Sequence, residues 1–214
     1  MKVLLIRHGK TIFNTQGKVQ GWSDTPLTEA GRAGAMTLGK NLAGETIDGW
    51  YASDSGRARE TASILQAYSN HAHLPLHEHE GLREVYFGTF EGGFNSAMLE
   101  SLKEGLSPKF KDVHMMWDVP VPDVVDTLCT IDNGEAESWD VYEKRVTKAM
   151  KNVVKHAKEE NCEQIAIVSH GFTIRTLIHV YGYSGEVTDI ENCSMTEIDA
   201  SGESFIVNNV NTHR

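Results

Sequence analysis

The sequence has few of the features that mark a secreted, membrane-bound or disulfide-linked protein. Its 214 residues include only three cysteines, widely spaced and without a CxxC pair, which argues against a disulfide framework and a thiolate zinc site. The apolar run before Arg7 has four residues, too few for a signal-peptide core, and no later run is long enough to span a bilayer. We therefore expect a cytoplasmic protein.

Positive charge is also scarce. The chain has 20 Lys and Arg residues against 30 Asp and Glu residues, a formal net charge of -10. The field of such a chain repels polyanions, which argues against nucleic acid and membrane partners. With 40% hydrophobic and 23% charged residues the composition is that of a globular protein, and the length predicts a single domain over residues 1–214.

Two strand-to-helix junctions carry the most information. Residues 3–6 (VLLI) form a continuous apolar run, typical of a strand buried on both faces, and the run stops at Arg7-His8-Gly9. Residues 164–169 (QIAIVS) repeat this pattern and end at Ser169-His170-Gly171. Open α/β sheets bind their ligands at the carboxyl edge of the strands, so both histidines are expected at such an edge.

The remaining periodicity alternates helices with strands. Helices are expected at 29–42 after a Thr28 cap, and at 57–68, 139–157 and 172–181; strands are expected at 50–53, 76–82, 193–199 and 204–210, the last two as a hairpin. This order predicts an α/β fold, a three-layer α/β/α arrangement of a mainly parallel sheet with an antiparallel edge strand. Three glycines weaken the helix at 29–42, so packing must hold it.

Residues 92–134 interrupt the alternation. A short helical piece at 98–106 is followed by predicted loops around Pro120 and Pro122. The segment also carries Met115, Met116 and Trp117, whose apolar side chains need cover. We interpret it as a small, mostly helical insertion over the site rather than as a linker.

The two junctions suit a phosphate group. A helix N-terminus offers free N–H groups and the positive end of a dipole, and the planar guanidinium of Arg7 matches phosphate oxygens. Four histidines in residues 71–79 invite a metal interpretation, but no carboxylate or cysteine partner is tied to them by spacing. We expect no metal site and no cofactor.

At the level of motifs, the sequence resembles the histidine phosphatase superfamily, and more closely its phosphoglycerate mutase-like branch, which includes small cytoplasmic phosphatases. The matching residues keep the family's order from residue 7 to about 175: Arg7-His8-Gly9-Lys10-Thr11, Asn14, Gly21, Pro26-Leu27-Thr28, Gly31, Ser53-Asp54, Arg57-Ala58, Thr61-Ala62, Leu82-Arg83-Glu84, Glu137-Ser138 and Ser169-His170-Gly171. Lys10 departs from the pattern, because the family commonly has Glu or Gln there. It either adds a cation to the pocket or faces solvent.

The resemblance implies a role for each matched residue. His8 corresponds to the nucleophile that becomes a phosphohistidine, and Glu84 to the general acid that protonates the leaving alkoxide and then activates water. The transferred phosphoryl group would be held by Arg7, Arg57 and His170, together with Asn14, Gln20 and the backbone N–H groups of Gly21 and Gly171.

The implied activity is that of a metal-independent phosphatase acting on a small phosphorylated metabolite. A mutase must exclude water while a doubly phosphorylated intermediate reorients, which calls for additional basic residues over the site. Mutases of the family carry an arginine pair there, whereas residues 92–134 of this chain contain no arginine. A phosphoglycerate mutase and a non-catalytic phospho-ligand binding protein stay as alternatives, and the oligomeric state is left open.

Overall fold

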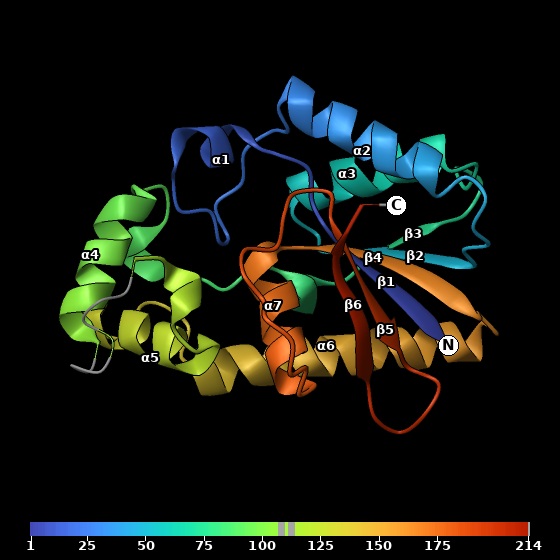
Figure 1. Ribbon diagram of the computed structural model, residues 1–214. Helices are drawn as coiled ribbons and strands as arrows, with labels where there is room; N and C mark the ends of the chain where they lie inside the picture. The colour runs from blue at the N-terminus through green and yellow to red at the C-terminus, as the bar shows by residue number, and fades with distance from the viewer. Residues whose placement is uncertain (107–109, 111–113, 214) are drawn as a thin grey trace.

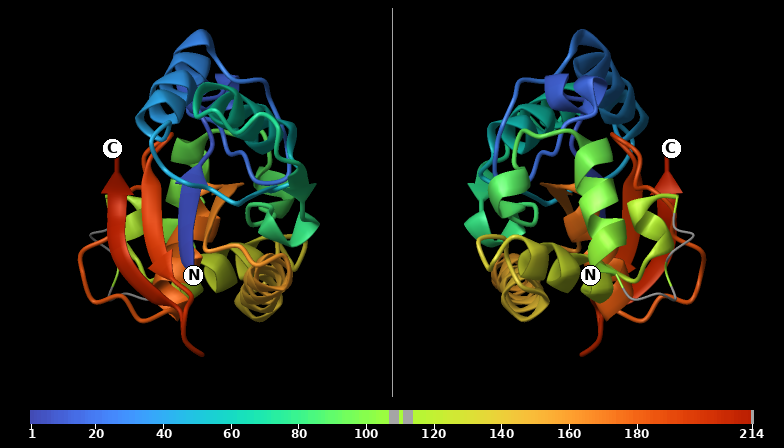
Figure 2. Two further views of the ribbon diagram at one scale, coloured as in Figure 1. Left: turned by 90° about the vertical axis from the view of Figure 1, so that its right-hand side faces the viewer. Right: turned by 90° about the vertical axis from the view of Figure 1, so that its left-hand side faces the viewer.

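The computed structural model describes residues 1–106, 110 and 114–213, which form three layers around one sheet (Figure 1). The six strands lie in the order β3-β2-β4-β1-β5-β6. Helices α2 (Glu29–Asn41) and α3 (Gly56–Tyr68) cover one face of the sheet, while α6 (Trp139–Glu159) and α7 (Gly171–Val180) cover the other (Figure 2). No helix in the described ranges is long and apolar enough to cross a bilayer.

Four neighbouring strands of the sheet are parallel to one another. β1 (Lys2–Arg7) pairs with β4 (Gln164–Ser169), which pairs with β2 (Gly49–Ala52), which in turn pairs with β3 (Leu76–Glu78). On the other side of β1, β5 (Met195–Asp199) is antiparallel and continues into β6 (Ile206–Thr212) through the predicted hairpin. The α/β fold with a mainly parallel sheet and an antiparallel edge is therefore confirmed.

Alternate residues of the strands supply two separate cores. Leu4 and Ile6 of β1 face α2 and α3 and pack in the cluster that contains Trp50 and Leu65. Val3 and Leu5 face the opposite side and share a cluster with residues of α6 and α7 such as Ile174. This is why the run is apolar at every position, as expected for a strand covered on both faces.

The predicted insertion is helical and lies beyond the carboxyl ends of the parallel strands (Figures 1 and 2). It contains α4 (Asn95–Gly105), the short 3₁₀ turn η4 (Met116–Asp118) and α5 (Val121–Ile131). The prediction of loops around Pro120 and Pro122 was wrong, because these two residues form the N-cap and first turn of α5. The first N–H groups of a helix have no acceptor within it, so proline is tolerated there.

Shorter elements complete the chain. The predicted strand at 76–82 is only three residues long and is followed by the 3₁₀ turn η1 (Glu80–Leu82). A second 3₁₀ turn, η2 (Gly88–Phe90), precedes the insertion, and a five-residue helix, α1 (Ile12–Gln16), follows β1. The turn η1 brings the chain from the sheet edge towards α6, where Glu84 is held.

Close backbone approach explains two of the three glycines in α2. A Cβ at Gly31 would lie 2.1 Å from the carbonyl oxygen of Lys10, and one at Gly39 would lie 2.9 Å from Cβ of Tyr68. Gly34 is different, since a Cβ there would meet only the Cys193 side chain, at 3.4 Å or more. Packing against the loop after β1 and against α3 therefore offsets the low helix propensity of this segment.

Replacing Gly31 by alanine should lower the free energy of unfolding by about 1–3 kcal/mol, because the added methyl group would overlap backbone atoms of Lys10. Gly34→Ala in the same helix is the matched control, and it should be neutral or stabilising by up to about 1 kcal/mol, the difference in helix propensity. Urea denaturation followed by circular dichroism measures both. Equal stability of the two variants would contradict the packing explanation.

Candidate active site

Five predicted residues converge at the carboxyl edge of the parallel strands. Arg7 ends β1 and is followed by His8. Ser169, the partner of Arg7 in the sheet, ends β4 and is followed by His170. Arg57 lies in the first turn of α3 after β2, and Glu84 follows β3 and η1. The four groups that lie deepest are almost entirely covered, with relative exposures of 4% for His8, 1% for Arg57, 7% for Glu84 and 0% for His170.

His8 is oriented by a hydrogen bond on each ring nitrogen. Its Nδ1 lies 2.8 Å from the carbonyl oxygen of Gly9, which can only accept, so Nδ1 carries the proton. Its Nε2 accepts from Nε of Arg57 at 3.2 Å and is therefore unprotonated. Burial and the nearby Arg57 and Arg7 guanidiniums hold the pKa of His8 well below its ordinary value. The imidazole is thus neutral, with a lone pair on Nε2.

Arg57 joins the separate loops of the site. All of its guanidinium nitrogens are engaged: besides His8, they donate to the carbonyl oxygens of Gly21 at 2.8 Å and Ser23 at 2.9 Å, to the Asp24 carboxylate at 2.9 Å and to Nδ1 of His170 at 2.9 Å. Asp24 supplies the counter-charge that a buried arginine requires. One side chain therefore sets the position of both histidines.

His170 lies beside His8, with ring centroids 5.3 Å apart in an edge-on arrangement. Because its Nδ1 accepts from Arg57, its Nε2 carries the proton and faces the Ser55 hydroxyl at 3.3 Å. Burial, Arg57 and His8 hold the pKa of His170 well below its ordinary value. Both histidines are therefore neutral in the folded protein.

Arg7 combines a tethered end with an available donor. Its Nη1 donates to the carbonyl oxygen of Ile190 and to the Asp189 carboxylate at 3.3 Å, both in the loop before β5. Its Nε is buried and, within the described part of the chain, has no hydrogen-bond partner. Gly171 adjoins this atom, since a Cβ there would lie 3.2 Å from it. A buried donor of this kind calls for an acceptor, and an oxyanion in the cavity would supply one.

Glu84 is held at the N-terminus of α7. Its carboxylate accepts from the backbone N–H groups of Phe172 and Thr173, both at 2.9 Å, and from the Thr173 hydroxyl at 3.1 Å. The Tyr142 hydroxyl also faces it at 3.4 Å. Burial raises the pKa of Glu84 above its ordinary value, and the N–H donors offset only part of that effect. The group can therefore hold a proton and, after losing it, has donors for the resulting charge.

Asn14 and Gln20 lie in the cavity wall but are tied into their own loop. The Asn14 side-chain oxygen accepts from the Thr11 N–H at 3.1 Å in a capping box. The Gln20 amide accepts from the Thr11 hydroxyl at 2.6 Å and donates to the Thr25 hydroxyl at 3.1 Å. Both residues line the cavity together with Arg7.

The Gly21 N–H, which is predicted to bind phosphate, donates to the Glu91 carboxylate at 3.1 Å in this structure. Glu91 also accepts from the backbone N–H groups of Trp22 at 2.9 Å and Ser23 at 3.0 Å. It is a structural carboxylate that orders the loop whose carbonyl oxygens hold Arg57. Nothing in its sequence context, a glycine-rich stretch, indicated this contact.

Arg145 is a second contributor that sequence reasoning missed. This residue of α6 forms a two-fold ion pair with Glu137, at 2.8 and 2.7 Å. The same guanidinium donates to the carbonyl oxygens of Gly81, Arg83 and Glu84 at 3.0–3.1 Å. Arg145 thus fixes the backbone that carries Glu84. Its position within the amphipathic repeat of α6 gave no sign of this function.

A cavity of about 400 Å³ lies between part of this cluster and the insertion, and His8, Arg57 and His170 are not among its lining residues. Its lining includes the predicted site residues Arg7, Asn14, Gln20, Glu84 and Gly171. The rest of the lining is mixed: it has apolar side chains from Val19, Phe87, Met98, Leu99, Met115, Met116, Trp117, Phe172 and Ile190, and polar or charged ones from Lys18, Asn95, Ser96, Arg175, Thr188 and Asp189. Lys10 is exposed and does not belong to the lining, so the solvent-facing alternative holds for this side chain.

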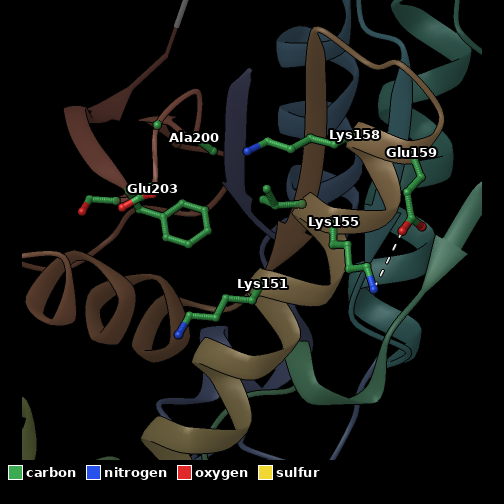
Figure 3. Close-up of a pocket in the computed structure, with 10 residues that line it drawn as sticks. Lys151, Lys155, Lys158, Glu159, Ala200 and Glu203 are labelled. Atoms are coloured by element: carbon green, nitrogen blue, oxygen red, sulfur yellow. Dashed lines mark ion pairs between the residues drawn. The ribbon is translucent and has the colours of Figure 1, made fainter.

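Another hollow lies on the opposite side of the fold, between α6 and the β5–β6 turn (Figure 3). It is lined by Lys151, Lys155 and Lys158 of α6, and Lys155 pairs with Glu159 at 3.8 Å. None of the predicted site residues reaches it. The chemistry of the molecule is therefore concentrated in the first cavity.

The histidine-rich segment forms ring contacts. His77 stacks on Tyr51 with centroids 5.3 Å apart and lies 4.9 Å from His156, whose Nδ1 pairs with the Tyr51 hydroxyl. Over residues 1–106, 110 and 114–213, no group of three or more His, Cys, Asp or Glu side chains is placed to hold a metal ion.

Comparison with known proteins agrees with this geometry. The family model for the histidine phosphatase superfamily (branch 1) matches residues 3–213. The broad-specificity phosphatase YOR283W of Saccharomyces cerevisiae is 27% identical over 98% of this chain and 85% of its own. The metal-independent phosphoserine phosphatase of Arabidopsis thaliana is 24% identical over 96% and 79%. The crystal structure of phosphoglycerate mutase from Bacillus anthracis has a TM-score of 0.92 and 31% identity, covering 100% of this chain and 93% of that one.

The buried neutral histidines should make the fold sensitive to acid. The pKa of His170 lies well below 6.5, so below that pH the unfolded chain binds a proton that the folded protein does not. Each such histidine lowers the free energy of unfolding by up to about 1.4 kcal/mol per pH unit as the pH falls through this range. His170→Asn should therefore lose less stability than the wild type between about pH 7 and about pH 5.5, measured by urea unfolding.

His114→Asn serves as the control for this experiment, because His114 is exposed. Its unfolding free energy should follow that of the wild type across the same pH range. A His170→Asn variant with the wild-type pH dependence would mean that His170 is protonated in the folded protein.

Proposed function

The chain belongs to branch 1 of the histidine phosphatase superfamily, and on that basis we propose that it hydrolyses a small phosphomonoester through a phosphohistidine on His8. One observation carries the proposal: the His8 imidazole is buried and neutral, with its unprotonated Nε2 directed at the Arg57 guanidinium. A nucleophilic nitrogen beside two arginines is what attack on a phosphate dianion requires.

In the first step Nε2 of His8 attacks phosphorus, and the bond to the leaving oxygen breaks. The hydrogen bond from Arg57 Nε to Nε2 must be given up as the P–N bond forms, which frees that N–H for a phosphoryl oxygen. Arg7 Nε and the N-terminus of α7 at Gly171 face the same region and would hold further oxygens. Positioning and charge stabilisation of this kind account for most of the catalysis of phosphoryl transfer.

Glu84 supplies and then removes the proton. Burial raises its pKa, so the carboxyl group can protonate the departing alkoxide in the first step. The resulting carboxylate is stabilised by the Phe172 and Thr173 N–H groups. In the second step it takes a proton from water as the water oxygen bonds to phosphorus and the P–N bond breaks. Inorganic phosphate leaves and His8 returns to its neutral form.

Asn14, Gln20 and Gly171 complete the proposed phosphate site. All three line the cavity with Arg7. Gly21 contributes differently from the expectation, since its carbonyl oxygen orients Arg57 at 2.8 Å. His170 likewise acts through Arg57 and through its contact with His8.

Phosphoglycerate mutase activity is the second candidate, because the Bacillus anthracis structure with TM-score 0.92 is a mutase by its title. Two features of this chain favour hydrolysis. Residues 92–134 contain no arginine, and beyond the predicted site residues the cavity lining has only Lys18 and Arg175 as cations, the latter bound to backbone carbonyl groups. A doubly phosphorylated intermediate would need more positive charge in that wall. Faster transfer between 2- and 3-phosphoglycerate than hydrolysis would favour the mutase.

His8→Ala should abolish hydrolysis of an aryl phosphate such as 4-nitrophenyl phosphate, because it removes the nitrogen that forms the proposed phosphoenzyme. Product release followed by absorbance is the measurement, with circular dichroism as the test of folding. EDTA should leave the wild-type rate unchanged. Hydrolysis by folded His8→Ala at more than a trace of the wild-type rate would rule out the phosphohistidine.

Glu84→Gln should slow an alkyl phosphate by about 10²–10⁴-fold and an aryl phosphate far less, because a phenolate leaves without a proton. The wild-type rate on the alkyl ester should also fall as the pH rises through the pKa of Glu84, which burial raises. Steady-state kinetics on glycerol phosphate and 4-nitrophenyl phosphate provides the comparison. Equal losses on the two esters would show that Glu84 is not the general acid.

A further inference from the structure

The segment at residues 115–119, here called the wall segment, forms one side of the cavity. Its side chains Met115, Met116 and Trp117 all line that cavity. Its only regular structure is the three-residue turn η4, closed by the Asp118 carboxylate, which accepts from the Met115 N–H at 2.9 Å and the His114 N–H at 3.3 Å. So short a turn has little stability by itself, and the wall depends on contacts to the rest of the fold.

Val119 and Met116 pack against the hydrophobic core, and a side chain of α7 binds the backbone of the segment. The Arg175 guanidinium donates to the backbone carbonyl oxygens of Trp117 at 2.6 Å, Val119 at 3.0 Å and Met116 at 3.5 Å. Its guanidinium also lies 5.9 Å from the centroid of the Phe172 ring, a second component of the cavity wall. Partly buried carbonyl groups need donors, and a planar arginine can serve three of them at once.

These hydrogen bonds use both Nη groups of the Arg175 guanidinium. Both Nη2 hydrogens have carbonyl acceptors, and the carboxylates of Asp118 and Asp189 interact with the guanidinium from nearby. Arg175 therefore differs from Arg7, whose buried Nε has no partner in the described structure. The Nη donors of Arg175 hold the backbone of the wall, although its side chain also belongs to the cavity lining.

We propose that Arg175 is a positioning residue that holds the wall segment in place and thereby makes the cavity selective for phosphomonoesters of uncharged, largely apolar alcohols, aromatic ones included. This inference rests on the proposed phosphatase function and names its class of substrate. An alcohol that carries a carboxylate would place a charge against methionine, tryptophan and phenylalanine side chains. Of the two further cations in the lining, Arg175 is bound to carbonyl oxygens and Lys18 lies over the Phe13 and Phe94 rings, 5.2 and 5.7 Å from their centroids.

The test compares Arg175→Met and Arg175→Lys with the wild type on three esters: 1-naphthyl phosphate, glycerol phosphate and O-phosphoserine. The wild type should have its highest kcat/KM on the naphthyl ester. Arg175→Met should raise KM for that ester by about tenfold or more, the size of effect that a few lost apolar contacts produce, and change kcat for glycerol phosphate less than about twofold. The KM of Arg175→Lys for the naphthyl ester should lie between those of the wild type and Arg175→Met, because one ammonium group cannot reach three carbonyl oxygens.

Arg59→Met is the matched control. The Arg59 side chain is 51% exposed and makes an exposed ion pair with Glu78 at 3.7 Å, remote from the cavity lining. Its kinetics should equal those of the wild type. Trp117→Ala provides a second variant, since it removes a wall side chain while the backbone carbonyl that Arg175 binds stays. It should reproduce the selective loss on the naphthyl ester.

Two results would overturn the inference. A uniform loss on all three esters would mean that Arg175 supports the fold alone, and a loss confined to phosphoserine would mean that it binds a substrate carboxylate directly. Calorimetric binding of 1-naphthylmethyl phosphonate, which cannot be hydrolysed at its P–C bond, separates this inference from the proposed function. Binding that is lost in Arg175→Met supports the inference even if no variant hydrolyses any ester, whereas such inactivity would refute the phosphatase proposal.

Discussion

A buried guanidinium organises the site. Arg57 donates to both histidines and to the loop that contains Gly21 and Ser23, and Asp24 balances its charge. Because Arg57 can only donate, it requires an unprotonated nitrogen on each imidazole, and with burial it keeps both rings neutral. A charge that is expensive to bury thereby sets the ionisation state on which the proposed attack by His8 depends.

Two opposing effects meet at Glu84. Burial favours the protonated carboxyl, whereas two backbone N–H groups at the start of α7 favour the carboxylate. The proposed reaction uses both forms in succession. A carboxyl group that was always protonated could not activate water, and one that was always ionised could not protonate the leaving group. Arg145 and Trp22 hold the Glu84 carbonyl oxygen from the opposite side, each at 3.0 Å, which fixes the carboxyl between them and the helix.

Helix α7 connects the two ends of the cavity. Its first turn adjoins Arg7 and binds Glu84, and one turn later Arg175 holds the wall segment of the insertion. The distance between the phosphate end and the apolar end is therefore set by a rigid element rather than by a loop. Arg175 binds backbone carbonyl groups of the wall segment, so a change of side chain at those positions leaves its acceptors in place.

The sequence by itself predicted the strands of the sheet, the helices α2, α3, α6 and α7 and the identity of the junction residues. Apolar runs that stop at a histidine and a glycine place His8 and His170 at strand ends, and that relation is local. The family motifs added Arg57 and Glu84 to the predicted site, and the roles of these two residues stay predictions. Only the tertiary structure decided that the Gly21 N–H binds Glu91, that the prolines begin α5 and that Arg145 and Arg175 hold backbone carbonyl groups. These hydrogen bonds from Gly21, Arg145 and Arg175 join residues 56 to 70 positions apart, so no local pattern encodes them.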